Sequence, residues 1–262
     1  MPPRDVTAAT STLLTGKVVL VTGAGRGAGV GMARRLAAHG ATVAVNYAAS
    51  RAGADALVDE IRSAGGTASA FAADVLDPAA VDGLIAAVEA EFGRLDAVVN
   101  NAIAGDQQKD FDQATTAHFD RMYDFAVRAV VHTATAALPA FDRAGGGRIV
   151  NIVSELWNDA PAGWSPYAAA KGAMVGLSRS LSAELAPRGV TVNMVAPGWM
   201  IADAADEASE GSRSYTAGLP LGQRPYPEDI GDVIAFYLSD LAAGVTGAYL
   251  LVNGGRITQA GL

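Results

Sequence analysis

Residues 17–40 read KVVLVTGAGRGAGVGMARRLAAHG, and this stretch decides the fold class. Its first part, KVVLVTG, is a short apolar run typical of a strand that is buried on both faces. The apolar stripe of GVGMARRLAAHG predicts a helix that closes at Gly40. A glycine-rich turn joins the two. Strand, glycine turn and helix in this order are typical of the start of an α/β fold.

The same alternation continues to the end of the chain. Further apolar strands are expected at 42–47, 68–75, 95–102, 147–154, 190–198 and 248–255. Further helices are expected at 53–65, 77–93, 116–142, 165–187 and 227–240. Strands that are apolar on both faces predict a single-domain Rossmann fold, in which a doubly wound, seven-stranded parallel sheet carries helices on both faces.

Two segments are expected to lie outside this core. Residues 1–15 lack a signal-peptide pattern and a long apolar span, so we expect a flexible tail followed by one domain over 16–262. Residues 199–225 are rich in Ala, Ser, Gly and acidic side chains, and we expect a mobile, irregular lid over the substrate. No other segment resembles a membrane span, so we expect a cytoplasmic protein with no membrane partner.

Composition argues against several kinds of function. The formal charge is −8 and there is no Lys/Arg cluster, which disfavours nucleic acid as a partner. Without cysteine, the chain has no disulfide, thiolate nucleophile or thiolate metal site. The spacings of the three histidines, His39, His118 and His132, match no metal pattern, so we expect no metal site.

The turn at 22–29 has the pattern T-G-x-x-x-G-x-G, which places Gly23, Gly27 and Gly29 before the helix. Glycine lets the backbone turn tightly and lets a pyrophosphate approach amide groups at the positive end of the helix. A tight connection between strand and helix would explain the same glycines without a ligand. The order of strand, loop and helix favours a dinucleotide site.

The end of the second strand bears on which dinucleotide binds. NAD sites usually carry an acid there, which binds the ribose hydroxyls and repels a 2′-phosphate. Here the strand ends in Asn-Tyr-Ala at 46–48, and no carboxylate follows before Asp55. Arg26 in the glycine loop, with Ser50 and Arg51 beyond the strand, favours the phosphate of NADP(H). NAD(H) is the alternative.

Polar side chains also follow the third and fourth strands. Asp74 and Val75 end the third strand, where a carboxylate can accept a hydrogen bond from the adenine amino group. Asn100, Asn101 and Ala102 end the fourth strand, where amides can hold ribose and neighbouring backbone. A turn that starts at Asp74 and a helix capped by Asn101 are the structural alternatives.

The stretch SELWNDAPAGWSPYAAAK, residues 154–171, carries three side chains suited to catalysis. Ser154 is expected at the carboxyl end of the fifth strand, and Tyr167 and Lys171 on one face of the next helix. We expect the lysine ammonium to stabilise the phenolate and to move the pKa of Tyr167 towards neutral pH. Ser154 would then hydrogen-bond a substrate oxygen, Tyr167 would exchange its proton, and Lys171 would also hold the nicotinamide ribose. This set predicts hydride transfer between a carbonyl and an alcohol.

Taken together, these motifs resemble the short-chain dehydrogenase/reductase family, and in particular its bacterial 3-oxoacyl-carrier-protein-reductase-like group. The resemblance covers about residues 16–256 and adds Asn193, Pro197-Gly198 and the closing LLVNGG to the motifs above. It implies NADP(H), a Ser-Tyr-Lys mechanism, and a homotetramer or homodimer built on the long central helices and the C-terminal strand region. With the resemblance, the residues expected to bind the cofactor are Gly23, Gly25, Arg26, Gly27, Gly29, Asn46, Tyr47, Ala48, Asp74, Val75, Asn101, Ala102, Tyr167, Lys171, Pro197, Gly198 and Met200.

Four positions depart from the family pattern. The family usually has a catalytic asparagine on the central helix, where this chain has Ala126 in the phrase DFAV. An alanine side chain cannot hold the water of the family's proton relay, although its backbone carbonyl could. Ile103 replaces a glycine, Ala28 replaces a bulky residue, and Ala202 replaces the threonine that binds the carboxamide. We expect an unusual pocket around the nicotinamide, suited to a larger or more apolar substrate.

The leading hypothesis is an NADP(H)-dependent ketoreductase that reduces a small-molecule ketone to a secondary alcohol. One alternative is a catalytically weakened cofactor-binding protein that acts as a sensor or scaffold. The other is an alcohol dehydrogenase that oxidises a sugar or steroid. We expect the substrate to lie under the lid against Trp157, Trp164 and Trp199, for which ordinary packing is the alternative.

Overall fold

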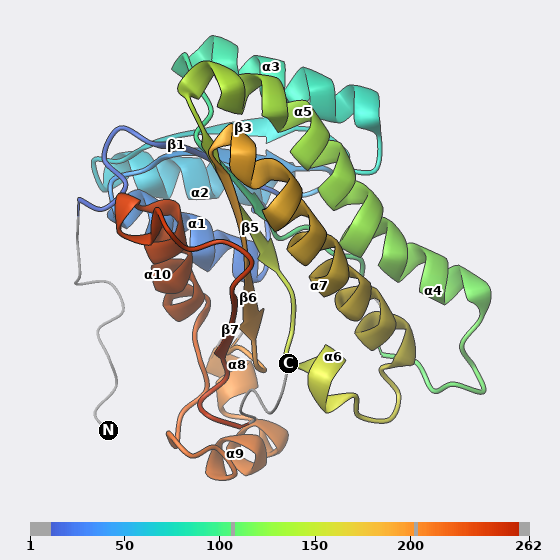
Figure 1. Cartoon of the computed structure of the whole chain (residues 1–262). Coiled ribbons are helices and arrows are strands. Elements are labelled where there is room, and N and C mark those ends of the chain that lie inside the picture. The colour runs from blue at the N-terminus through green and yellow to red at the C-terminus, as the bar shows by residue number, and fades with distance from the viewer. Residues whose placement is uncertain (1–11, 106–107, 202–203, 257–262) are drawn as a thin grey trace.

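A computed structural model describes residues 12–105, 108–201 and 204–256 of the chain (Figure 1). Their seven strands form one sheet in the order β3-β2-β1-β4-β5-β6-β7, and every neighbouring pair is parallel. The strands are β1 Val18–Val21, β2 Thr42–Tyr47, β3 Thr67–Ala72, β4 Ala97–Asn100, β5 Gly147–Ile152, β6 Val190–Pro197 and β7 Tyr249–Val252. The predicted seven-stranded, doubly wound parallel sheet is confirmed.

The order of the strands reverses between β1 and β4. The sheet grows from β1 through β2 to β3 on one side and from β4 to β7 on the other, so β1 and β4 lie side by side. In open α/β sheets, ligands bind in the crevice that such a reversal leaves at the carboxyl ends of the strands. The fold therefore points to the segments that follow β1 and β4.

Helices cover both faces of this sheet (Figure 1). Helices α1, α2 and α10 pack on one face, and α3, α5 and α7 pack on the other. The helices are α1 Ala28–Ala38, α2 Arg51–Ser63, α3 Pro78–Phe92, α4 Thr116–Tyr123, α5 Ala129–Ala144, α6 Leu156–Asp159, α7 Ser165–Leu185, α8 Ala204–Glu207, α9 Glu210–Ala217 and α10 Pro227–Leu238.

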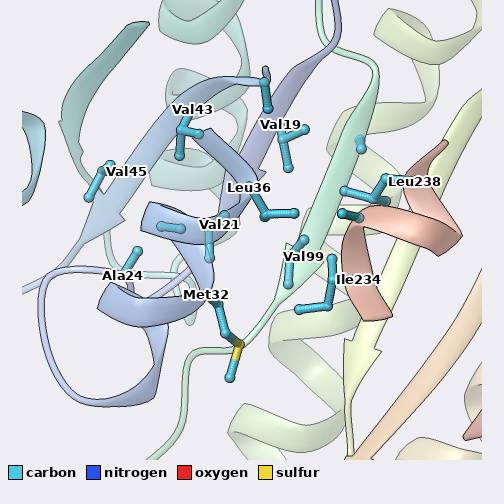
Figure 2. Close-up of a cluster of buried hydrophobic side chains, with 14 of the residues drawn as sticks. Val19, Val21, Ala24, Met32, Leu36, Val43, Val45, Val99, Ile234 and Leu238 are labelled. Carbon is cyan, nitrogen blue, oxygen red and sulfur yellow. The ribbon is translucent and has the colours of Figure 1, made fainter. Parts of the chain in front are cut away.

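Successive side chains of β1 point to opposite faces of the sheet and build two separate cores. On one face, Val19 packs with Met32 of α1 and Ile234 of α10 (Figure 2). On the other face, Leu20 belongs to a cluster that contains Phe141 of α5. All five side chains are fully buried. This arrangement explains why the strand has no polar position that would mark a solvent-facing side.

The single helix predicted at 116–142 is divided in the structure. α4 ends at Tyr123, residues Asp124–Arg128 form a π-helical turn, and α5 continues to Ala144. The N–H of Ala129 bonds to the carbonyl of Asp124, as the wider turn requires. Hydrophobic spacing predicted the helix but not this insertion, because a π turn shifts the helical register by one residue without ending the helix. Ala126 is buried inside the turn.

Two expectations about irregular segments differ from the structure. Leu14 falls in the predicted tail, yet it is fully buried in the β1 core and its N–H donates to the carbonyl of His39. The segment 199–225 was predicted to be irregular, yet it contains α8 and α9. Long-range packing orders both places, and short windows of sequence do not report such packing. Residues 1–11 and 202–203 of the predicted tail and lid lie outside the described residues.

The burial of Leu14 yields a stability prediction. Leu14→Ala should lower the free energy of unfolding by about 2–5 kcal/mol, because it removes a fully buried side chain and leaves a cavity. Leu13→Ala is the matched control: Leu13 is 36% exposed, and its loss should change the free energy by about 0.5 kcal/mol or less. Urea unfolding of the two variants measures both values. Equal, small effects would show that the segment before β1 adds nothing to the core.

Candidate active site

A large cavity opens at the carboxyl ends of the strands, on both sides of the reversal between β1 and β4. Its volume is about 750 Å³. Every residue predicted to be catalytic or to bind the cofactor lines this cavity, except Asn46. These residues come from segments far apart in the sequence, and parallel pairing brings their positions to one edge of the sheet.

Two close contacts shape the glycine loop between β1 and α1. Gly23 has a φ of 64°, and a Cβ at this position would lie 2.9 Å from the Cα of Ala102. A Cβ on Gly29 would lie 2.6 Å from the Nδ2 atom of Asn101. A larger residue at either position would therefore displace the segment after β4. The segment after β4 thus packs closely against the glycine loop, and the loop also borders the cavity.

The contact between the ends of β1 and β4 depends on Thr22 and Asn101. The Asn101 Nδ2 atom donates to the carbonyl of Thr22 at 2.9 Å, and the main-chain N–H of Asn101 donates to the Thr22 hydroxyl at 3.0 Å. The N–H of Ala102 donates to the same hydroxyl at 3.0 Å. The amide of Asn101 thus holds neighbouring backbone, as one part of its prediction stated. The alternative of a helix cap is wrong, because no helix starts there.

Two other predicted cofactor residues have partners within the protein. Asn46 is 1% exposed, and its Oδ1 atom accepts the N–H of Gly23 at 3.2 Å while its Nδ2 atom donates to the carbonyl of Ala73 at 3.1 Å. Asn46 therefore supports the glycine loop from beneath and does not line the cavity, contrary to the prediction. Asp74 accepts the N–H of Leu76 at 2.9 Å, which is the predicted turn, and it also borders the cavity.

Ser154, Tyr167 and Lys171 meet at one end of the cavity. Ser154 follows β5, and the other two lie one turn apart on α7. The Lys171 Nζ atom lies 5.7 Å from the centre of the Tyr167 ring and donates to the carbonyl of Ile152 at 2.6 Å. Ser154 also hydrogen-bonds Tyr167. All three side chains are buried, yet all three border the cavity.

Burial controls the protonation of this group. Loss of hydration raises the pKa of Tyr167 to about 12, and the hydrogen bond from Ser154 lowers it by a smaller amount. Burial lowers the pKa of Lys171 to about 7. The expectation that the lysine brings the tyrosine pKa towards neutrality is therefore wrong for this structure. Both the phenolate and the ammonium are disfavoured in an apolar site, so at pH 7 the tyrosine holds its proton.

Comparison with known proteins agrees with this geometry. A family model described as Enoyl-(Acyl carrier protein) reductase matches residues 23–256. A short-chain dehydrogenase from Burkholderia cenocepacia, solved in complex with NADP, is 36% identical, covers 93% of this chain and 99% of its own, and superimposes with a TM-score of 0.85. The chain belongs to the short-chain dehydrogenase/reductase family. It is therefore an oxidoreductase.

Two further members of the short-chain dehydrogenase/reductase family are similar over nearly the full length. The 3-oxoacyl-(acyl-carrier-protein) reductase FabG of Staphylococcus aureus is 38% identical over 91% of this chain and 97% of its own. A 7α-hydroxysteroid dehydrogenase complexed with NADH and 7-oxo glycochenodeoxycholic acid is 31% identical, covers 94% of this chain and 96% of its own, and has a TM-score of 0.86. The family is shown by sequence and structure alike.

Three of the four positions that depart from the family pattern lie within the described residues. Ile103 and Ala28 border the cavity, so these replacements change its wall. Ala126 lies in the π-helical turn and is 3% exposed. Ala202 lies outside the described residues. Phe125, the neighbour of Ala126, also lines the cavity, which makes this part of the wall apolar.

The three tryptophans expected around the substrate do not line the cavity. Trp157 donates from Nε1 to the Tyr249 hydroxyl at 2.9 Å and packs edge-on against that ring. The Trp199 ring lies 4.2 Å from the Arg224 guanidinium carbon. Trp164 packs edge-on against the Tyr167 ring, with centroids 5.6 Å apart. Packing, the stated alternative, therefore accounts for their contacts, and only Trp164 touches a predicted catalytic residue.

Sequence reasoning missed a polar cluster directly behind Ser154. Glu155 is 2% exposed and bonds to Tyr215, Asn253 and Arg256. A glutamate immediately after Ser154, at the carboxyl end of an apolar strand, was the signal that could have led to it. Asn253 also lies within the motif LLVNGG, but the sequence alone does not show which side chain it hydrogen-bonds.

Two absences hold for the residues that the structure describes. No group of three or more His, Cys, Asp or Glu side chains among residues 12–105, 108–201 and 204–256 could hold a metal ion. Over the same ranges, no helix has both the length and the apolar composition needed to cross a bilayer.

The low pKa of Lys171 predicts a pH dependence of stability. Because its pKa is about 7 in the fold and 10.5 in the unfolded chain, the unfolded chain binds more protons between these values. The free energy of unfolding therefore rises with pH in this window, and this contribution is lost as pH falls to 7. Relative to Lys171→Met, the wild type should gain about 1–3 kcal/mol between pH 7 and pH 9, measured by urea unfolding. A difference that stays flat across this window would refute the buried, weakly basic lysine.

Proposed function

We propose that this protein is an NADP(H)-dependent ketoreductase that interconverts a ketone and a secondary alcohol through Ser154, Tyr167 and Lys171. One observation carries the proposal: these three side chains and the glycine loop border the same cavity. The first group has the chemistry of proton transfer to an oxygen, and the second has the backbone shape for a pyrophosphate.

The volume and the lining of the cavity support a dinucleotide as its ligand. Its volume of about 750 Å³ lies within the range of cofactor and ligand sites. At Gly27, a Cβ would meet no atom within 4 Å, so the loop leaves open space there rather than being filled by packing. Arg26 is exposed and borders the cavity next to Tyr47 and Ser50, where no carboxylate opposes a phosphate. These groups would hold the adenosine half with its 2′-phosphate.

The chain's own residues would then perform the proton transfer. When bound, the reduced nicotinamide supplies the hydride. The Ser154 hydroxyl would hydrogen-bond the substrate oxygen, and Tyr167, protonated at pH 7 because burial raises its pKa to about 12, would donate its proton to that oxygen. Lys171, whose pKa burial lowers to about 7, can take up or release a proton near the working pH and lies on the same helix face. A protonated Tyr167 can supply the proton that reduction of the carbonyl consumes.

The replacement at Ala126 favours a second candidate, a catalytically weakened family member that binds the cofactor as a sensor or scaffold. No side chain at 126 can hold a relay water to Lys171. Against it, the π-helical turn Asp124–Arg128 persists without the usual asparagine, and such a turn frees a main-chain carbonyl that can accept a hydrogen bond. We favour an active enzyme in which backbone replaces the missing amide.

Apolar side chains that border the cavity bear on the substrate. They include Ile103, Phe125 and Met200, so we propose a ketone with an apolar body. A relative is named a 3-oxoacyl-(acyl-carrier-protein) reductase, and a structural neighbour is complexed with 7-oxo glycochenodeoxycholic acid; both names contain an oxo compound, which supports a ketone as the substrate class. Oxidation of a steroid or sugar alcohol is the reverse alternative. The cytoplasmic location and the homotetramer or homodimer stay predictions.

Tyr167→Phe tests the proposal, because it removes the donated proton and almost no volume. Turnover should fall by about 10²- to 10⁴-fold, while the Kd for NADPH stays within about three-fold. The measurement is NADPH oxidation against a panel of ketones, with binding followed by cofactor fluorescence. Wild-type affinity for NADPH without turnover of any ketone would favour the sensor or scaffold instead.

Tyr237→Phe serves as the matched control for this variant. Tyr237 is a buried tyrosine of α10 that does not line the cavity, so the loss of its hydroxyl should leave turnover unchanged within about two-fold. If Tyr167→Phe retained normal activity while this control did too, the assignment of Tyr167 as proton donor would be wrong.

Arg26→Ala tests the preference for the phosphorylated cofactor. Loss of a charge-assisted contact to a phosphate should weaken NADPH binding about 10-fold and leave NADH binding within about two-fold. The sequence also offered Arg51 for the phosphate, but Arg51 bonds to Asp55 at 3.4 Å and does not line the cavity, so Arg51→Ala is the control. Titration by fluorescence compares the two cofactors. Equal weakening of both, or a selective loss in the Arg51 variant only, would contradict the assignment to Arg26.

A further inference from the structure

Glu155 is a buried carboxylate next to the proposed catalytic serine. It is 2% exposed, and its two oxygens accept hydrogen bonds from three side chains. The Tyr215 hydroxyl donates to Oε1 at 2.8 Å, the Arg256 Nη1 atom donates to Oε1 at 2.9 Å, and the Asn253 Nδ2 atom donates to Oε2 at 2.9 Å. Its own N–H donates to the carbonyl of Pro197 at 3.1 Å.

The donors to Glu155 come from separate segments of the chain. Tyr215 lies on α9, whereas Asn253 and Arg256 follow β7. The Arg256 guanidinium also lies 5.2 Å from the centre of the Tyr215 ring and pairs with Asp159 of α6 at 2.6 Å. One carboxylate thus joins the loop after β5, α9 and the segment after β7. Buried charges of this kind are retained only when their hydrogen bonds are satisfied, as they are here.

This cluster of Glu155, Tyr215, Asn253 and Arg256 lies directly behind the cavity wall. Ser154, one residue before Glu155, borders the cavity, and so does Gly198. A Cβ on Gly198 would lie 2.9 Å from the Cβ of Asn253 and 3.3 Å from the Tyr215 hydroxyl. The wall and the cluster are therefore in contact, and a shift of either would move the other.

The segment around α9 has a second set of buried contacts that does not include Glu155. Arg224 is fully buried, donates to the carbonyls of Trp199 and Met200 and to the Ser212 hydroxyl, and pairs with Asp206 at 2.7 Å. These contacts close the base of the segment by themselves. The bond from Tyr215 to Glu155 instead attaches the closed segment to the loop that carries Ser154.

We propose that Glu155 is a positioning residue: it fixes Ser154 by attaching α9 and the segment after β7 to the loop after β5. The inference rests on the proposed function, in which Ser154 orients the substrate oxygen. A serine displaced by a fraction of an ångström would still leave the cofactor site intact. The expected signature is therefore a loss in turnover of the ketone without a loss of cofactor affinity.

Tyr215→Phe is the main test, because it removes the hydroxyl that donates to Glu155 at 2.8 Å and accepts the Trp199 N–H at 3.4 Å, and keeps the ring that packs against Trp199 and Arg256. With NADPH and ethyl acetoacetate as the probe ketone, kcat/KM should fall about 10-fold, while the Kd for NADPH stays within about two-fold. Hydrogen exchange, followed by mass spectrometry, should rise in peptides that cover 153–160 and 210–218. Glu155→Gln, which keeps the side-chain length and one acceptor oxygen, should retain more activity than Glu155→Ala.

Tyr226→Phe is the matched control. Its hydroxyl donates to the Glu207 carboxylate at 3.0 Å, the same kind of bond, but this bond does not reach the loop after β5. It should leave kcat/KM and exchange at 153–160 unchanged within about two-fold.

The outcomes separate the inference from the proposed function. Unchanged kcat/KM in Tyr215→Phe, with or without faster exchange, would overturn the positioning role. An equal fall of kcat/KM in Tyr215→Phe and Tyr226→Phe would also overturn the positioning role, because the loss would then come from the segment around α9 and not from the bond to Glu155. If the wild type reduces no ketone of the panel, the proposed function fails. The exchange measurement then still decides whether Tyr215 and Glu155 hold the Ser154 loop, and unchanged exchange at 153–160 refutes that attachment.

Discussion

The contact between the carboxyl ends of β1 and β4 is the constraint on which the rest of the structure depends. Parallel pairing places the two strands together, and the Thr22 hydroxyl accepts the N–H groups of Asn101 and Ala102. Gly23 then lies so close to Ala102 that no side chain fits between them. The glycine loop is thereby forced to turn outward, and the cavity opens where the strand order reverses.

The same burial that builds the site determines its protonation. Tyr167 and Lys171 sit on a helix whose inner face packs into the core, so each gives up hydration of its charged form. As a result, Tyr167 keeps its proton and Lys171 releases one easily. Carbonyl reduction requires this order, since the proton must be present before it is transferred. The hydrogen bond from Ser154 to Tyr167 plays the smaller part.

The part of the site around Ser154 and Pro197 is held by buried polar groups as well as by the sheet. The sheet positions Ser154 and Pro197, but the segments around them are joined by buried polar groups, with Glu155 on one side and Arg224 on the other. Each buried charge has several donors or acceptors from distant parts of the chain, and these networks specify one arrangement more strictly than apolar contact does. Ala126 lies in a π-helical turn of the main chain that forms without an asparagine side chain at that position.

The sequence by itself determined the parallel fold, the glycine loop and the set of Ser154, Tyr167 and Lys171, because these depend on local periodicity and on residue types at short spacing. It also indicated the family, which the comparisons show. Tertiary structure decided that Asn46 supports the glycine loop instead of lining the cavity, that Leu14 belongs to the core, and that the tryptophans pack within the protein. It likewise decided the pKa direction of Tyr167 and the partners of Glu155. Burial and long-range hydrogen bonds arise only when distant segments meet, and no short window of sequence contains that information.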